Sequence, residues 1–490
     1  MSREALIVGV DVATQAVRTV CCDPDGTVLA TGAADLPPPK RPAAGRAEQD
    51  ARSWWPATRA ALREMTSSLD RRSRRISALA IAATSGTLVL VDKHGDPVGP
   101  GVMYDDRRGE REAERAQAAA EERWRRLGLR ISPTFSLPKL AVLVREDRAK
   151  DAAYVCHTPD LLTWRLVGAR TPTDWSHALK TGYDALVGGW AEEAFEALEI
   201  DLDLLPEVLP PTTPVGAVSR EAAAETGLPE GCEVRLGMTD SCAGQVACGT
   251  SEPGQFVSVL GTTLVLKGVT EELVRDPSGA VYSHRHPDGY WLPGGASSTG
   301  GEALLDYPRE RLDDLNRRAE EHGPASFLCY PLRREGERFP FVESEASGFS
   351  DGEPRDEIDG YRAALEGVAF CERLGYDHLA RLGAVPEPPI ATAGGGNKSR
   401  IWLRIRATVL GWPLQLAEQA TTSFGASVLA AAGGVHPNLA AAAERMVRVT
   451  ETIEPVEQER EPLAERYSEL VAALAKRGWI DSQLRTAAGG

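Results

Sequence analysis

Two similar strand–turn–strand segments stand far apart in the chain, and they constrain its fold more than any other feature. The first lies within residues 5–31 and carries Asp11, Thr14 and Gln15 around its turn. The second lies within residues 255–267 and turns at Gly261-Thr262-Thr263. Such turns can offer backbone N–H groups and hydroxyls to phosphate oxygens. A plain hairpin turn explains either segment alone, but the second copy favours a phosphate-binding interpretation of both.

Two single carboxylates stand close to these segments. Asp11 follows an apolar strand, where a carboxylate is costly unless it is paired or near a cation such as water-bridged Mg²⁺. Asp240 stands at the expected start of a small-residue helix, within Gly237-Met-Thr-Asp240-Ser. Each has a structural alternative, because Asp11 could cap its own turn and Asp240 could cap its helix.

Two glycine loops follow the second hairpin, at residues 294–301 and 394–399. Glycine before a helix lets backbone N–H groups approach an anion closely. Neither loop has the Gly-x-Gly-x-x-Gly pattern of a dinucleotide fold, and neither ends in the Gly-Lys-Ser/Thr of a P-loop. Taken with the hairpins and the lone carboxylates, the loops predict a nucleotide site of another type.

Length, charge and cysteine content limit the possibilities further. A chain of 490 residues is too long for one core, and we predict two domains, 1–248 and 249–490. The net charge of −16 argues against nucleic acid or an anionic membrane as a partner. No apolar run approaches the roughly twenty residues that span a bilayer, and the eight cysteines show no metal-ligand or disulfide spacing. We therefore expect a cytoplasmic protein with reduced thiols.

No functional role is assigned to four other polar residues, His177, Asp106, Arg108 and Lys139. We expect His177 to be a structural histidine, because no Ser/His/Asp pattern surrounds it. Asp106 and Arg108 could form an ion pair at a helix start, which contributes little if it is exposed. The role of Lys139 stays open.

On these motifs the sequence resembles the FGGY family of carbohydrate kinases from about Ile7 to Gly434. Within the family it is similar to the branch of D-ribulose kinases and short xylulose kinases. The stretches that carry this second similarity include Thr84-Ser85-Gly-Thr87, residues 176–184, residues 281–285, residues 295–301 and Gly336-Glu-Arg-Phe-Pro340. Tyr104 stands where many members carry Trp, and Ser399 stands where Asn is common.

The resemblance implies an α/β protein of two actin-like (ribonuclease H-like) domains with a cleft between them, often dimeric, that uses ATP and Mg²⁺. Asp240 would be the general base on the sugar hydroxyl, Asp11 would face Mg²⁺ and the phosphates, and Ser85 would contact the sugar. The remaining residues implied for ATP are Thr14, Gln15, Gly261, Thr262, Gly300, Gly301, Gly395 and Ser399. Phosphoryl transfer needs mainly positioning and charge neutralisation, so this small set is chemically sufficient.

We expect the substrate to be a ketopentose, and D-ribulose phosphorylated at C5 ahead of D-xylulose. These two sugars differ only at C3, and Ser85 offers a short hydroxyl where many xylulose kinases carry a Met-His pair. D-Xylulose, another sugar or a polyol remains the alternative. A non-sugar ATPase or a sugar sensor on the same fold is a further alternative, and Asp240 argues against it because only a sugar kinase needs a base facing the acceptor.

Overall fold

The computed structural model describes residues 5–489 and divides them into two compact units. The first unit comprises residues up to Gly249 together with His284–Gly289 and Thr421–Arg448. The second comprises Thr250–Ser283, Tyr290–Ala420 and the residues from Val449 onward. Segments that follow residue 249 thus pack within the first unit, and the sequence boundary between 248 and 249 stays a prediction.

The first unit is built on a mixed six-stranded sheet in the order β13-β14-β5-β1-β2-β3. Its central strand β1 is buried along its whole length and pairs antiparallel with β2 and parallel with β5. The strands of this sheet are β1 (Leu6–Val12), β2 (Ala16–Cys22), β3 (Val28–Asp35), β5 (Ile76–Ala83), β13 (Pro214–Ala217) and β14 (Glu233–Arg235).

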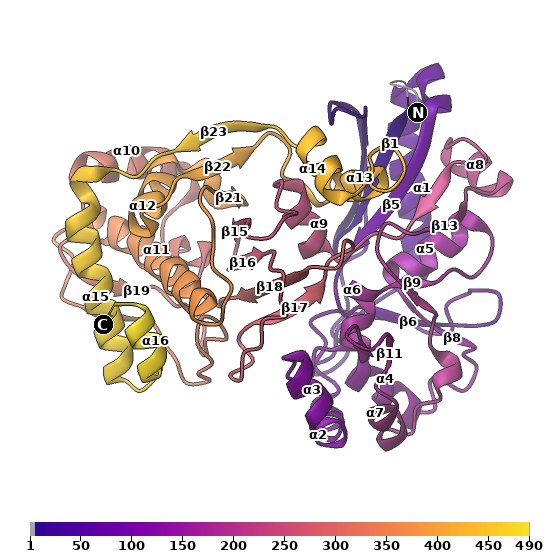
Figure 1. Cartoon of the computed structure of the whole chain (residues 1–490), viewed down its shortest axis with the longest axis horizontal. Helices are drawn as coiled ribbons and strands as arrows, with labels where there is room; N and C mark the ends of the chain where they lie inside the picture. Colours follow the sequence, from indigo (N-terminus) through magenta and orange to yellow (C-terminus); the bar gives the residue numbers. More distant parts are fainter. Residues whose placement is uncertain (1–4, 490) are drawn as a thin grey trace. The chain divides into compact units, whose positions relative to one another are not determined.

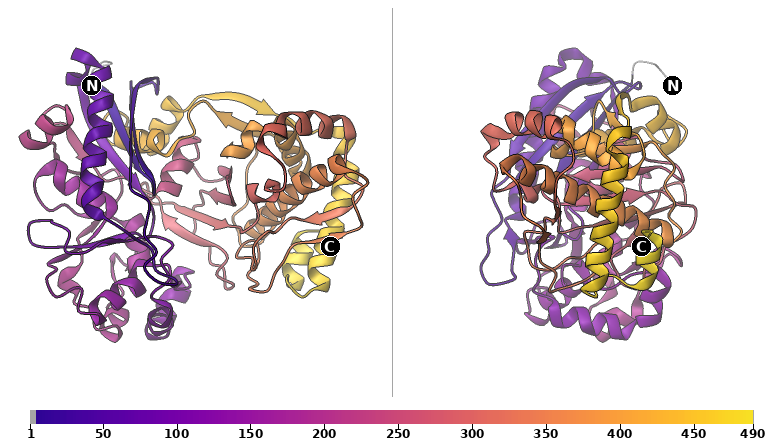
Figure 2. Two further views of the ribbon diagram at one scale, coloured as in Figure 1. Left: turned by 180° about the vertical axis from the view of Figure 1, so that it is seen from behind. Right: turned by 90° about the vertical axis from the view of Figure 1, so that its left-hand side faces the viewer.

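Helices cover both faces of this sheet (Figure 1). Helix α1 packs against β2 and β3, with α5 and α8 beside it, while α13 packs against β1 and β5 and holds α9. Figure 2 shows the same helix layers from behind. These helices are α1 (Trp54–Ser68), α5 (Thr158–Val167), α8 (Arg220–Thr226), α9 (Asp240–Ala247) and α13 (Thr422–Ala431).

The rest of the first unit forms a smaller subdomain around a four-stranded sheet, β4-β7-β6-β8. Its strands are β4 (Glu48–Gln49), β6 (Leu88–Val91), β7 (Gly101–Val102) and β8 (Tyr154–His157), with short pairs β9 (Thr173–Asp174), β10 (Tyr183–Asp184), β11 (Gly189–Trp190) and β12 (Val208–Leu209). Its helices are α2 (Glu110–Ala119), α3 (Glu121–Leu127), α4 (Ser136–Arg145), α6 (Trp175–Ala178) and α7 (Glu192–Ala197). Helix α14 (Leu439–Met446) packs instead on α13.

The second unit repeats the strand plan of the first. Its sheet contains the order β18-β16-β15-β21-β22-β23, in which β15 pairs antiparallel with β16 and parallel with β21, as β1 does with β2 and β5. The strands are β15 (Phe256–Leu260), β16 (Leu264–Gly268), β18 (Trp291–Ala296), β21 (Ile390–Ala393), β22 (Leu414–Ala417) and β23 (Val449–Ile453). The expected duplicated α/β fold is confirmed at the level of strand order.

Helices α11 and α12 pack against each other and on this second sheet, and the other helices of the unit pack on them. The bounds are α10 (Leu312–His322), α11 (Glu357–Arg381), α12 (Arg400–Leu410), α15 (Arg460–Lys476) and α16 (Ser482–Ala487). A separate pair, β19 (Leu328–Tyr330) and β20 (Phe349–Asp351), lies beside α11, and β17 (Tyr282–Arg285) contains residues of both units. Among residues 5–489 no helix is long and apolar enough to cross a bilayer.

Candidate active site

In the first unit, the sheet register brings the predicted site residues to one edge. Strand β1, which contains Asp11, runs parallel to β5, and β5 ends at Ala83. Ala83 also forms a parallel bridge with Thr239. The carboxyl ends of parallel strands meet at one edge of a sheet, where ligands of open α/β sheets bind. Ser85 stands two residues after Ala83 and Asp240 directly after Thr239, so both lie at the edge that Asp11 reaches.

Asp11 is buried and only loosely paired. Its Oδ2 lies 3.9 Å from Nη1 of Arg18, and its buried Oδ1 has no hydrogen-bond partner. Burial, followed by repulsion from Asp240, raises the pKa of Asp11 to about 7, against a lowering by Arg18. The turn-capping alternative does not account for this side chain, because the turn closes through backbone groups, from Ala13 N to Ala16 O at 3.0 Å.

Asp240 is the first residue of α9 rather than its cap. Thr239 occupies the N-cap position without a side-chain capping bond, and Asp240 Oδ1 accepts from the N–H of Ser241 at 2.7 Å. A carboxylate in the first helical turn is stabilised by the helix dipole. The backbone before it runs close to β5, since a Cβ at Gly237 would lie 2.0 Å from the carbonyl oxygen of Ile81.

The loop after β5 carries the predicted sugar contact. The hydroxyls of Thr84 and Thr87 share a hydrogen bond of 2.7 Å, while the Oγ of Ser85 is buried without a partner. Lys139 on α4 donates to the carbonyl oxygens of Gly86 at 2.6 Å and Met103 at 2.9 Å. Burial lowers the pKa of Lys139 to about 7, with a partial offset from Asp106. The ammonium therefore holds the loop that presents Ser85, a role that the sequence did not reveal.

The ion pair expected between Asp106 and Arg108 is present, and it is buried. The side chain of Asp106 is fully buried and that of Arg108 is 1% exposed. Arg108 also bonds Glu48 at 2.9 Å, and Asp106 accepts from the N–H of Ala47 at 2.6 Å. This network ties β4 to the start of the α2 region. Because both charges are buried, removal of either partner would leave the other uncompensated and would destabilise the protein strongly.

In the first hairpin, Thr14 and Gln15 form the turn between β1 and β2. The carbonyl oxygen of Thr14 accepts from Nε2 of Gln49 at 2.8 Å, and that of Gln15 accepts from the N–H of Leu36 at 2.9 Å. Both carbonyl oxygens thus accept hydrogen bonds from other parts of the protein. Gln15 itself is exposed.

In the second unit, a cavity of about 560 Å³ collects most of the residues predicted for ATP. Gly261, Thr262, Gly301, Gly395 and Ser399 all line it. The residues that the sequence did not identify include the apolar and aromatic Leu304, Leu305, Tyr307, Leu312, Tyr361 and Trp402 and the polar Glu302, Arg309, Asp313, Asn316 and Lys398. Apolar walls with a few polar groups are typical of small-molecule pockets.

Gly300 directly precedes the lining residue Gly301. A Cβ at Gly300 would lie 2.5 Å from Thr263 Cα, and a Cβ at Gly301 would lie 2.4 Å from the carbonyl oxygen of Gly261. The N–H of Gly301 donates to that oxygen at 2.9 Å. Only glycine allows the loop to lie directly on the second hairpin. Ser399 caps α12 and donates to Asn316 Oδ1 at 2.7 Å, so its hydroxyl is already engaged.

The same loop is anchored by a buried carboxylate, Glu337. Its Oε2 accepts from the hydroxyls of Ser297 at 3.0 Å, Thr299 at 2.9 Å and Tyr330 at 2.9 Å. Its Oε1 accepts from the N–H groups of Ser298 and Arg338. Residues 297–299 lead directly into Gly300 and Gly301, so Glu337 sets the position of the loop beside the cavity.

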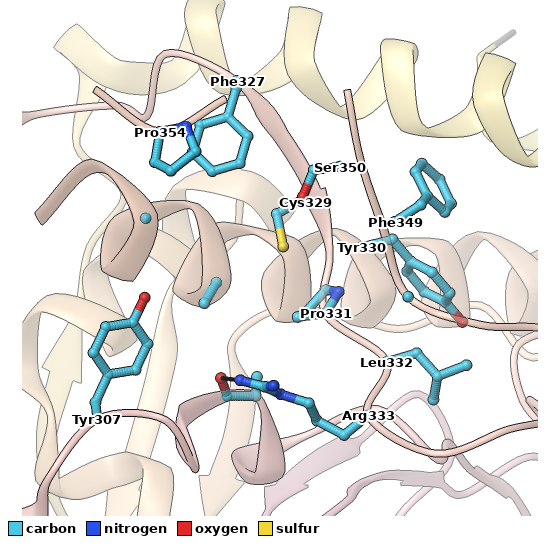
Figure 3. A pocket seen from close by; sticks show the side chains of 14 residues that line it. Tyr307, Phe327, Cys329, Tyr330, Pro331, Leu332, Arg333, Phe349, Ser350 and Pro354 are labelled. Atoms are coloured by element: carbon cyan, nitrogen blue, oxygen red, sulfur yellow. Dashed lines mark hydrogen bonds between the residues drawn. The ribbon is translucent and has the colours of Figure 1, made fainter. Parts of the chain in front are cut away.

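A second cavity of about 500 Å³ shares the lining residue Tyr307 with the first. Figure 3 shows the side chains that line this second cavity. Aromatic rings of Phe327, Tyr330 and Phe349 line it. Its one charged lining residue, Arg333, binds Asp306 and the carbonyl oxygen of Ala303. The charge of Arg333 is thus neutralised by the protein itself, and this residue gives no indication of a bound ligand.

Comparison with known proteins assigns both halves of the chain to one family. Residues 6–247 match the N-terminal domain of the FGGY family of carbohydrate kinases, and residues 256–434 match its C-terminal domain. The chain belongs to the FGGY family of carbohydrate kinases. It is an ATP-dependent sugar kinase with the mixed α/β two-domain fold of that family.

Named relatives of this FGGY kinase cover nearly its whole length. A xylulose kinase of Streptomyces rubiginosus is 30% identical over 471 residues, which are 94% of each chain. The crystal structure of a xylulose kinase from Rhodospirillum rubrum has a TM-score of 0.86 at 28% identity and covers 96% of this chain and 98% of its own. A Plasmodium falciparum glycerol kinase solved with ADP shares the fold, with a TM-score of 0.83 at 16% identity over 97% and 99% of the two chains.

The first unit of this FGGY kinase fits the Mg²⁺ that the family implies. Across residues 5–489 no group of three or more His, Cys, Asp or Glu side chains could hold a metal ion. Mg²⁺ needs no such cage, because it keeps several waters and uses one or two carboxylates with substrate phosphates. The unpartnered Oδ1 of Asp11 would supply a hard oxygen of this kind, facing the ion through water.

Proposed function

We propose that this FGGY kinase transfers the γ-phosphoryl group of ATP to the terminal hydroxyl of a ketopentose, with D-xylulose as its main substrate. Two relatives support this choice of sugar. The Streptomyces rubiginosus protein, 30% identical, and the Rhodospirillum rubrum protein, 28% identical, are both named xylulose kinases. They favour D-xylulose over the D-ribulose expected from Ser85. D-Ribulose is the second candidate, because an unpartnered Ser85 hydroxyl would serve a ketose of either configuration. The dimer implied by the resemblance stays a prediction.

The observation that carries the proposal is a group of buried oxygen atoms without partners at one sheet edge. Asp11 Oδ1, Ser85 Oγ and Thr239 Oγ1 are all buried and make no hydrogen bond. A buried polar atom without a partner costs roughly 1–3 kcal/mol. Three such atoms around the start of α9 favour a site completed by a polyhydroxylated ligand and a hydrated cation.

In this proposal Asp240 accepts the proton of the sugar hydroxyl as that oxygen bonds to phosphorus. A carboxylate suffices because the hydroxyl becomes acidic only late in the transfer. Mg²⁺ near Asp11 would neutralise charge on the phosphates. The turns at Thr14-Gln15 and Gly261-Thr262 would provide phosphate contacts, and the cavity of the second unit would bind the adenine nucleoside.

A non-sugar ATPase would need the nucleotide pocket and Asp11 but not Ser85 or Asp240. Repulsion between Asp11 and Asp240 makes it unfavourable to keep both side chains ionised, and it contributes to the raised pKa of Asp11. A protein that only positions water gains nothing from a second carboxylate at this edge. This argument favours a base that faces an acceptor hydroxyl.

The test is a coupled assay of ADP formation with D-xylulose, D-ribulose, L-ribulose, ribitol and glycerol. We expect the highest kcat/KM with D-xylulose and, for Asp240→Asn, a loss in kcat of order 10² or more with the KM for ATP nearly unchanged. A Ser85→Ala variant should lose kcat/KM for the ketose. A tenfold preference for D-ribulose would reverse the choice of sugar, and near-normal turnover by Asp240→Asn would remove the base assignment.

A further inference from the structure

Asp174 and the residues that follow it form a fully buried hydrogen-bonded network beside the catalytic edge. Asp174 caps α6, and its Oδ1 accepts from the N–H of Ser176 at 2.8 Å, the N–H of His177 at 3.2 Å and the hydroxyl of Ser176. Its Oδ2 bonds Nδ1 of His177 at 2.5 Å. The side chains of Ser176 and His177 are completely buried.

One end of the network reaches the residue before the base. A serine hydroxyl has one proton and two lone pairs, and Ser176 gives its proton to Asp174. The remaining lone pairs let Ser176 Oγ accept from the backbone N–H of Thr239 at 3.0 Å. Thr239 is the N-cap residue of α9, and Asp240 follows it directly. Ser176 thereby fixes the backbone from which the Asp240 side chain projects.

The other end reaches the loop that presents Ser85. Nε2 of His177 lies 3.3 Å from the carbonyl oxygen of Ala83, the last residue of β5. A carbonyl and an ionised carboxylate only accept hydrogen bonds, so both ring nitrogens of His177 must carry protons. The imidazolium pairs with Asp174, and this ion pair raises the pKa of His177 and lowers that of Asp174 against the effect of burial.

We infer that Ser176, oriented by Asp174 and His177, is a positioning residue for catalysis: it aligns Asp240 with the loop at Ser85. The inference rests on the proposed function, because it assumes that Asp240 is the base. It also gives Ser176 and His177, the first two residues of the stretch 176–184 that the sequence singled out, a physical purpose. His177 makes only structural contacts, as expected, and through them it helps to hold the loop at Ser85 and to orient Ser176.

The decisive experiment is a double-mutant cycle between Ser176→Ala and Asp240→Asn. The Ser176→Ala variant should lose roughly 10-fold in kcat, within the loss of up to about 10²-fold that follows from displacing a catalytic group by 1 Å, while its KM for ATP stays unchanged. In the Asp240→Asn background the same change should have little further effect, because the group that Ser176 aligns is already absent. A purely structural serine would lower the rate by the same factor in both backgrounds.

Two further variants keep the outcome interpretable. Ser427→Ala removes a buried hydroxyl on α13 that donates to the carbonyl oxygen of Phe424, and it should leave kcat unchanged. Ser176→Thr keeps the hydroxyl and should recover part of the lost rate. Additive effects in the cycle, or a normal kcat for Ser176→Ala, would overturn the inference alone. Normal turnover by Asp240→Asn would instead overturn the proposed function on which it rests.

Discussion

At the scale of single residues, the buried ammonium of Lys139 predicts a pH dependence. Its folded-state pKa of about 7 lies below the ordinary value of 10.5, so the unfolded chain holds this proton more tightly. The free energy of unfolding should therefore rise with pH from about 7 to 10, relative to Lys139→Met, by at most about 5 kcal/mol. Urea unfolding of both proteins across this range measures the difference.

The Lys139→Met variant should also affect the loop at residues 84–87, which carries Ser85. Without Lys139 the carbonyl oxygens of Gly86 and Met103 lose their donor, so the KM for the ketose should rise while that for ATP stays constant. The exposed Lys93→Met is the matched control. A pH-independent difference in stability between Lys139→Met and the wild type would show that Lys139 keeps its ordinary pKa.

Gly395 gives a second prediction at the residue scale. A Cβ at this position would meet no protein atom within 4 Å, so Gly395→Ala should fold normally. Because Gly395 lines the cavity proposed for the nucleotide, the added methyl group should raise the KM for ATP several-fold. Gly189→Ala, where a Cβ also meets nothing within 4 Å, is the control that should change neither Tm nor KM. An unchanged KM for ATP in Gly395→Ala would show that Gly395 does not contact the nucleotide.

At the scale of elements, Glu337 holds the loop that follows β18 and lies on the second hairpin. A glutamine would keep one accepting oxygen and place an amide N–H₂ against donors, which leaves backbone N–H groups unpaired. We expect Glu337→Gln to destabilise the protein by about 1–3 kcal/mol and to raise the KM for ATP more than that for the ketose. Glu345→Gln, at an exposed position nearby, should do neither. Equal increases in both KM values would mean that the loop does not act through the cavity proposed for the nucleotide.

Elements defined by local pattern were predictable from the sequence, and those held by distant side chains were not. The strand–turn–strand segments expected within residues 5–31 and 255–267 are β1–β2 and β15–β16, and the small-residue helix expected at Asp240 is α9. The loop at 294–301 was expected to open a helix, but β18 extends to Ala296 and only a single 3₁₀ turn follows Gly300. Glu337, far along the chain, fixes that loop.

The candidate site shows the same division. The carboxylates Asp11 and Asp240 and the glycine loops were identified because they interrupt apolar or small-residue runs. The network of Asp174, Ser176 and His177 was not, because its meaning depends on the backbone of Thr239, which pairs with β5 only in the folded chain. Hydrogen bonds between a side chain and a remote backbone group leave no periodic signal in a sequence.

At the scale of the whole molecule, each unit holds one part of the proposed chemistry, and this predicts where each ligand protects the backbone. Ketose alone should slow amide hydrogen exchange most around residues 84–87 and the start of α9. ADP alone should do so around residues 261–263, 300–305 and 395–399, because ligands suppress the local opening of the segments they bind. The Asp240→Asn variant, mixed with ATP and sugar, should show both patterns without turnover. Protection by ADP centred on the Ser85 loop, or by ketose centred on the Gly395 loop, would contradict the assignment of the two sites to their units.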